Sequence, residues 1–354
     1  LFLLCSLISC REEIDLVSGK YQQSLVVDGM ITNEPGPYTV RLSYSTDVTD
    51  TSFIGASNCI VTIQEESGTS EVLKEVKEGI YKTSINGIQG KPGNSYRLIV
   101  ETLDNKIYQT DFQKMKPAIG IDTIYYNLEN TKYIHGEDIS GYQFYIGTQK
   151  STTQENYFLW ELTETFEYTV KYDLLAIMRR GKIIYDVDHD SLYRCWNTMN
   201  IKQIFTENTV DLLDPVLKNV PLNFVSNRTK RLQHRYSLLI KQYSLNKETY
   251  HFWNDIRNQV AGENFLYSRQ PYKIEGNIYN PENDDEYVLG YFTVASLDQK
   301  RFFVDRPNIQ IQKNRCYTDY YVNLYEPLSY REDILLVSAE YGLAVPDKEC
   351  VDCR

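Results

Sequence analysis

Cysteines are the residues of this chain whose number and spacing point most directly to chemistry. Seven are present, and four of them follow residue 190. In an exported chain an even number of cysteines favours disulfides, here two bonds with three possible pairings among Cys195, Cys316, Cys350 and Cys353. Cys350 and Cys353 also form a C-x-x-C pair, which could be half of a zinc site or a redox motif. Zinc would need a second such pair and a redox motif would need a βαβ unit, so we expect disulfides, with free thiols or a metal as the alternatives.

Cys10 lies in a different setting, at the end of the apolar run LFLLCSLISC. The run is shorter than the roughly 20 residues that cross a bilayer, and it is typical of the core of a signal peptide. The segment from Leu7 to Cys10 resembles the lipobox of bacterial lipoproteins, in which small residues precede the thiol that receives a diacylglycerol. We therefore expect residues 1–9 to be a signal-peptide remnant and Cys10 to be lipidated, which anchors the mature chain without a transmembrane helix. The alternative is a buried strand that contains a cysteine.

Acidic residues follow Cys10 directly. Glu12, Glu13 and Asp15 lie within five residues of it, and this patch resembles the surface-export signal of Bacteroidota lipoproteins. The simpler interpretation is a solvated linker. We predict a lipidated linker over residues 10–20, held by outer-membrane lipid through Cys10, with the chain facing the cell surface.

The other chemical motifs are weak. Asp186, Asp188 and Asp190 have the spacing of a calcium loop, but Ser191 and Asn197 stand where that loop has glycine and glutamate. A solvated acidic turn is the better interpretation. Nucleophile elbows, zinc-protease motifs, Walker loops and dinucleotide fingerprints do not occur. We predict no metal, no cofactor and no enzymatic activity; the alternative is a surface hydrolase, whose paired carboxylates would be assembled by the fold and not by the sequence.

The amino-acid composition disfavours further classes of partner and of fold. The chain has 37 basic and 48 acidic residues and a formal charge of −11, which disfavours nucleic acid as a partner. Thirty tyrosines exceed thirteen phenylalanines and three tryptophans, a balance that suits strands better than a helical bundle. A length of 354 residues has room for two domains.

Residues 21–117 have the pattern of a β-sandwich. Short alternating runs are separated by turn residues, and Cys59, Val61 and Ile63 share one face of such a run. Asp104 and Asn105 predict a tight hairpin. About seven short strands without helical periodicity predict an immunoglobulin-like or transthyretin-like sandwich.

Residues 118–354 are expected to form a larger β-rich domain with one or two inserted helices. Strands are predicted over 142–146, 157–170 and 287–294. One helix is predicted from an Asn246 N-cap to Gly262, with an aromatic and aliphatic stripe that packs against the sheet. A second, shorter helix is predicted over 210–217, although Pro215 disfavours it.

Several segments, taken together and in order, resemble one family. They are the lipobox, residues 25–32 and 37–43, Cys195-Trp196, residues 236–240 with Gln242, Ser244 and Leu245, residues 276–278 and 288–292, and the terminal residues 350–354. The chain is similar over essentially its whole mature length to a Bacteroidota outer-membrane lipoprotein family known as a domain of unknown function, forty-two forty-nine in that series. The resemblance implies a cell-envelope lipoprotein whose gene tends to lie beside a TonB-dependent transporter, and it brings no catalytic residues.

Our leading hypothesis is an accessory binding lipoprotein that assists a TonB-dependent transporter in nutrient uptake. Tyrosine offers rigid amphipathic contact area for a peptide or glycan ligand, although most tyrosines in such a chain simply pack sheet faces. The alternatives are a structural or adhesive surface module and a surface hydrolase.

Overall fold

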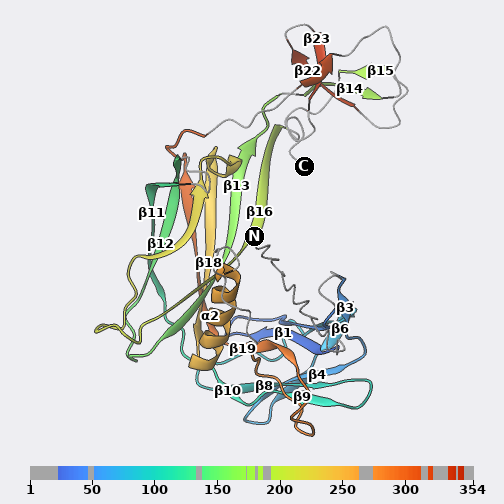
Figure 1. Cartoon of the computed structure of the whole chain (residues 1–354), viewed down its shortest axis with the longest axis vertical. Helices are drawn as coiled ribbons and strands as arrows, with labels where there is room; N and C mark the ends of the chain where they lie inside the picture. The colour runs from blue at the N-terminus through green and yellow to red at the C-terminus, as the bar shows by residue number, and fades with distance from the viewer. Residues whose placement is uncertain are drawn as a thin grey trace, which may run out of the picture.

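The computed structural model of the chain describes residues 23–46, 52–132, 138–172, 174–179, 182–185, 193–262, 274–311, 318–321, 334–339 and 342–346. These residues form five β-sheets, one α-helix and one 3-10 helix, so the predicted mainly β fold is confirmed. Figure 1 shows two layered β bodies, with helix α2 beside the place where they meet and a small sheet at the far end. Within the described ranges, no helix has the length and apolar character that crossing a membrane requires.

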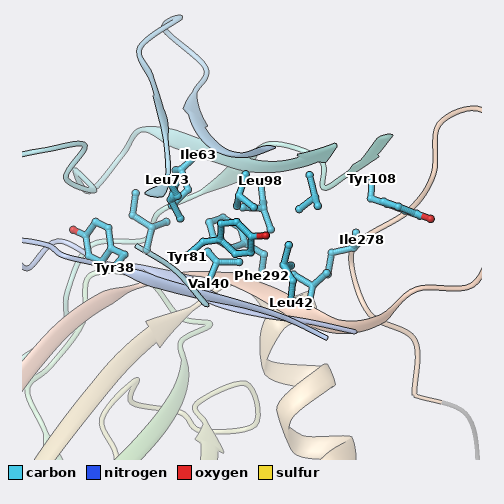
Figure 2. Close-up of a cluster of buried hydrophobic side chains, with 14 of the residues drawn as sticks. Tyr38, Val40, Leu42, Ile63, Leu73, Tyr81, Leu98, Tyr108, Ile278 and Phe292 are labelled. Atoms are coloured by element: carbon cyan, nitrogen blue, oxygen red, sulfur yellow. The ribbon is translucent and has the colours of Figure 1, made fainter. Parts of the chain in front are cut away.

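The N-terminal body is a sandwich of two sheets that share one buried core. Alternate residues of the longer strands point inward, and Figure 2 shows buried side chains meeting between the two layers. Val61 and Ile63 are fully buried in this core and Cys59 packs against it, which confirms their predicted shared face. The first sheet has the order β19 (Leu289–Val294), β1 (Leu25–Ile31), β2 (Thr39–Tyr44), β7 (Ile80–Lys82) and β6 (Lys74–Lys77), with β3 (Ile54–Gly55) on β2. The second sheet has the order β10 (Gln113–Lys114), β8 (Ser95–Glu101), β4 (Ile60–Glu65) and β5 (Ser70–Val72), with β9 (Ile107–Gln109) on β8.

The hairpin between β8 and β9 turns where the sequence predicts. Asn105 has a φ of 60°, the left-handed conformation that asparagine tolerates better than most residues.

Residues 274–294, far along the chain, complete this N-terminal sandwich. Strand β19 pairs in parallel with β1, from Val26 opposite Leu289 to Ile31 opposite Val294. Ile278 and Phe292 are buried in the same core as β1, β2 and β8. The predicted boundary between 117 and 118 lies between β10 and β11, yet the first sandwich also contains this strand from the segment 118–354.

The second body is another two-sheet sandwich. Trp160, Leu162 and Phe166 of β13 alternate into its core, which both sheets share. The predicted strands over 142–146 and 157–170 correspond to β12 and β13, and the strand over 287–294 corresponds to β19. One sheet has the order β11 (Ile121–Lys132), β12 (Asp138–Thr148) and β17 (Val220–Ser226). The other has the order β16 (Arg194–Asn208), β13 (Tyr157–Thr169), β18 (Arg235–Leu245) and β20 (Ser296–Asp305).

Helix α2 (Lys247–Gly262) follows β18 and ends where the sequence predicts. The side chain of Asn246 accepts a hydrogen bond of 2.7 Å from the backbone N–H of Thr249, which is the expected N-cap contact. Tyr250 packs with Tyr157 and Tyr243 on the outer face of the second sandwich, so the helix covers one end of that face.

The prediction of a second helix over 210–217 is wrong. These residues form a loop between β16 and β17. Pro215 lacks the N–H that a helix interior requires. Polar contacts to another loop also hold the chain in place, including the ion pair of 2.9 Å between Lys150 and Asp214.

A small third sheet lies at the end of the molecule farthest from the N-terminal sandwich (Figure 1). Leu174 and Val337 form the centre of its own small core. Its strands are β15 (Lys182–Ile184), β14 (Leu174–Arg179), β22 (Ile334–Ala339), β23 (Gly342–Pro346) and β21 (Thr318–Tyr321).

Candidate functional site

The second sandwich is open along one edge. Strand β17 ends one of its sheets and strand β16 ends the other, and no described strand joins these two edges. Two pockets lie along the opening, and both touch Lys202. We call them together the β16–β17 cleft.

The first of these, the polar pocket, has a volume of about 630 Å³. Its floor comes from β13 and β16, because alternation turns Glu164, Phe166 and Tyr168 of β13 to the same face. Its other side comes from residues 228–231, which include the 3-10 helix η1 (Lys230–Leu232). The side chain of Leu232 is buried and fixes this short helix to the core.

A buried carboxylate lies at the centre of the polar pocket. The side chain of Glu164 is 2% exposed, and both of its oxygens accept hydrogen bonds from Nη1 of Arg231, at 3.1 and 3.3 Å. The hydroxyl of Tyr236 donates to the same carboxylate at 2.9 Å. A charge this deep is tolerated because it is paired and hydrogen-bonded.

Tyr236 is a firm donor in this network. Burial, and then the negative charge of Glu164, raise the pKa of its phenol well above the usual value. The phenol therefore keeps its proton at every ordinary pH and continues to donate to Glu164. Asn223 in turn donates to the phenol oxygen at 3.4 Å.

Arg231 is held in one orientation. Besides the bonds from Nη1 to Glu164, its Nε donates to Oγ1 of Thr229 at 3.1 Å. Nη2, its third guanidinium nitrogen, makes no hydrogen bond to a residue that the structure describes, and the side chain is 25% exposed. A fixed guanidinium with free donors can bind an anion with little loss of conformational entropy.

Positive charge is concentrated around this arginine. Lys202, Arg228 and Lys230 also line the polar pocket, and the ammonium of Lys230 lies 5.1 Å from the ring centre of Tyr168. Among the described residues, Glu164 is the pocket's acidic lining residue. Basic residues thus outnumber acidic ones among the pocket's described lining residues, in a chain whose formal charge is −11.

The second pocket, the aromatic pocket, has a volume of about 830 Å³ and lies between β16, β17 and the last turns of α2. Trp160 and Phe205 form its apolar floor, and Val260 of α2, 57% exposed, lies at its rim. Arg257 closes the helix side by donating to the backbone oxygen of Thr206 at 2.7 Å.

Trp160 is itself fixed by a buried polar contact. Its indole N–H donates to Gln242 at 2.9 Å, and the amide nitrogen of Gln242 donates to the backbone oxygen of Ile119 at 2.7 Å. The floor of the aromatic pocket is therefore preformed.

The predicted cysteine sites fall in different places. Cys195 lies on β16 opposite Tyr168 and is disulfide-bonded. Cys10, Cys316, Cys350 and Cys353 lie outside the described residues, as do the acidic turn over 186–190 and the linker over 10–20. The described ranges contain no group of three or more histidine, cysteine or carboxylate side chains placed to hold a metal ion.

The central residues of the cleft, Glu164, Arg231 and Tyr236, were not among the predicted site residues. One signal was present in the sequence. Alternation along the predicted strand 157–170 puts Glu164 on the same face as Trp160 and Phe166, and a carboxylate on an apolar face requires a buried partner. Nothing in the sequence identifies Arg231 as that partner, since 67 residues separate the two.

The fold and the cleft define a β-rich protein of two sandwiches with a preformed pocket at one open edge. The family model for a domain of unknown function, DUF4249, matches residues 11–301. The chain belongs to this family, as its sequence resemblance predicts. No curated protein matches the chain.

Proposed function

We propose that the chain is a lipid-anchored protein of the outer membrane, facing the cell surface, that binds a ligand in the β16–β17 cleft and assists a TonB-dependent transporter. The observation that carries the binding role is the cleft itself, with its fixed Arg231 and its preformed aromatic floor. Pockets of this size, with apolar walls and a few placed polar groups, suit small ligands. The sequence around Cys10 and the acidic patch support the anchor and the location.

Binding, and not catalysis, is the role that the polar network supports. Both oxygens of Glu164 are engaged by Arg231, and Tyr236 adds a third hydrogen bond. A carboxylate with these partners positions other groups and does not offer itself to a substrate. Glycoside hydrolysis requires a second carboxylate across the bond that is cleaved. Glu164 is the acidic lining residue of the polar pocket among the described residues, and Glu207 lines the separate aromatic pocket.

The partner and the anchor are tested together. Full-length protein is purified from detergent-solubilised outer membranes of the native host, and co-purifying proteins are identified by mass spectrometry. We expect a TonB-dependent barrel in stoichiometric amount, and we expect the Cys10→Ala variant to leave the membrane fraction. Recovery of the protein without a barrel would remove the transporter role, and a Cys10→Ala variant that stays on membranes would remove the anchor.

The cleft is tested separately, with a panel of soluble oligosaccharides and short peptides and thermal shift as the readout. Val260→Trp fills the aromatic pocket from its rim and is expected to abolish the shift given by a bound ligand. Val76→Trp, at a site 53% exposed on the N-terminal sandwich, is the matched control and should keep the shift. Equal shifts in the two variants would place the ligand outside the cleft.

A further inference from the structure

Strand β16 is paired along one of its two edges. Figure 1 shows it at the border of its sheet, and no described strand joins its free edge. In an antiparallel pair, hydrogen-bonded residues alternate with residues whose N–H and C=O groups turn to the opposite edge. The N–H of Val170 donates to the backbone oxygen of Tyr193, so the bonded residues of β16 follow from Tyr193 in steps of two. Trp196, Thr198 and Asn200 lie between them and turn their backbone groups to the free edge.

The protein covers the far end of this edge with its own side chains. Nη1 of Arg257 donates to the backbone oxygen of Thr206 at 2.7 Å, and the backbone N–H of Asn208 donates to the side chain of Glu207 at 3.1 Å. The register against β13 also shifts after Ile201, which interrupts the ladder. Over residues 196–200, by contrast, no described group bonds to the backbone groups on the free edge. A row of unpaired backbone groups on an edge strand is a template for another strand.

Both faces of this stretch are open as well. Residues 196–200 are exposed one after another, with Trp196 54% and Met199 46% exposed. Thr198 belongs to the outer face of the sheet, where its hydroxyl lies 2.9 Å from that of Thr165, and Asn197 and Met199 line the polar pocket on the inner face. Side chains of an added strand alternate in the same way, so they would lie in turn in the polar pocket and beside Trp196.

We propose that the ligand of the cleft is a short free peptide, bound in extended form as an added strand along residues 196–200 of β16. Alternating N–H and C=O groups complement the backbone of another extended chain, and pockets for alternate side chains add selectivity. Inward side chains lie beside Phe166 and Met199, which favours apolar residues at those positions.

The length of the open stretch limits the ligand. Past Asn200 the peptide continues by Lys202, which lines both pockets, so its last side chain lies in the aromatic pocket. Arg257 and the register shift then end the edge, which suits a peptide of a few residues and not a long strand of a partner protein. This inference rests on the proposed binding role of the cleft and names the ligand class of that site.

The test uses the purified full-length protein in detergent and isothermal titration with three acetylated heptapeptides that carry a soluble polyethylene glycol tail. All have threonine at odd positions and leucine or phenylalanine at even positions. One is unmodified, one is N-methylated at the odd positions and one at the even positions. Methylation removes the N–H groups from one edge of the extended peptide and leaves its side chains unchanged. We expect one methylated peptide to bind like the unmodified peptide and the other at least about tenfold more weakly, as the loss of several hydrogen bonds predicts.

Variants connect the binding to the free edge. Thr198→Pro removes an N–H that faces the added strand and that β13 does not use, a place where an edge strand tolerates proline. Thr198→Ala is the matched control, because it removes the same contact with Thr165 and keeps the N–H. We expect Thr198→Pro to weaken binding of the unmodified peptide at least about tenfold relative to Thr198→Ala. Asn200→Pro and Asn200→Ala repeat the comparison, circular dichroism verifies the fold of each variant, and the methylated peptides test the same bonds without changing the protein.

Several results would overturn the inference. These are no binding of the unmodified peptide, equal binding of all three peptides, weakening by methylation in both registers, and equal binding to Thr198→Pro and Thr198→Ala. Loss of the co-purifying barrel from Thr198→Pro, and not from Thr198→Ala, would also overturn it, since the edge would then hold the transporter. An oligosaccharide whose thermal shift is abolished by Val260→Trp would refute the peptide and keep the cleft as a binding site. If no ligand of the panel loses its shift in Val260→Trp, the proposed binding role falls as well.

Discussion

The ion pair between Glu164 and Arg231 gives a quantitative test of the second sandwich. Arg231→Gln leaves a carboxylate that is 2% exposed without its cation. Removing one partner of a buried pair typically costs about 3–5 kcal/mol, because the remaining charge is uncompensated. Arg231 is 25% exposed, so water can reach part of the site and Tyr236 still donates. We therefore expect the lower end, about 3 kcal/mol less stability for this sandwich.

The double variant Glu164→Gln with Arg231→Gln separates this cause from a simple loss of contacts. It removes both charges, so no uncompensated charge is buried, and Tyr236 can still donate to the new amide oxygen. We expect it to recover most of the loss, ending within about 1–2 kcal/mol of the original protein. Arg235→Gln, in an exposed pair with Asp305, should cost no more than about 1 kcal/mol.

Urea unfolding followed by tryptophan fluorescence is the assay. Trp160 is 1% exposed in the core of the same sandwich and reports its unfolding, whereas Trp196 is 54% exposed. The reasoning would be refuted if Arg231→Gln cost no more than Arg235→Gln. It would also be refuted if the double variant were less stable than Arg231→Gln alone.

Three further predictions concern stability and reactivity elsewhere. Gly290→Ala should destabilise the N-terminal sandwich by about 3 kcal/mol or more, because φ is +91° and a Cβ would lie 1.9 Å from the carbonyl oxygen of Val27. The control is Gly68→Ala, where φ is +104° and the space around the new Cβ is open, and it should cost about 1 kcal/mol. Thermal unfolding compares the stability of the two variants. Asn246→Ala should cost about 1 kcal/mol by removing the N-cap of α2, measured by circular dichroism during urea unfolding. Burial raises the pKa of the Cys59 thiol, so its thiolate fraction at pH 8 is below that of an ordinary cysteine. Its reaction with a thiol reagent should therefore be slow at pH 8 and become faster as the pH rises. A fast reaction at pH 7 would contradict the burial of this thiol.

Local sequence patterns predicted much of the fold. Alternation identified the inward face of Val61 and Ile63, and a cap followed by helical spacing identified α2 from Asn246 to Gly262. Both depend on residues that are close in sequence. The helix predicted over 210–217 is a loop, because Pro215 disfavours a helix and contacts to a separate loop, such as Lys150 with Asp214, decide the conformation.

The sequence did not predict which residues far apart along the chain lie next to each other in the fold. Strand β19 lies beside β1, although Leu289 and Val26 are 263 positions apart, and an isolated apolar run does not specify its neighbour. Glu164 and Arg231 are similar: alternation predicts that the carboxylate points inward, but its cation is placed by the packing of η1 on the core. The cleft exists because two sheet edges, β16 and β17, end beside each other, and strand order is a property of the whole fold.

The pairing of β19 with the first sandwich also affects how rigidly that sandwich is joined to the second one, which contains the cleft. One residue, the fully buried Ala295, separates β19 of the first sandwich from β20 of the second. Asn33 bonds to both backbone groups of Leu297, and the side chain of Asp298 accepts from the backbone N–H of Ile121 at 2.7 Å. A hinge needs a few residues that are free to change φ and ψ, and the residues at this junction are buried or hydrogen-bonded. The two sandwiches should therefore move together, so that selectivity in the proposed cleft comes from side chains already in place, such as Arg231 and Trp160, and not from closure of one sandwich on the other.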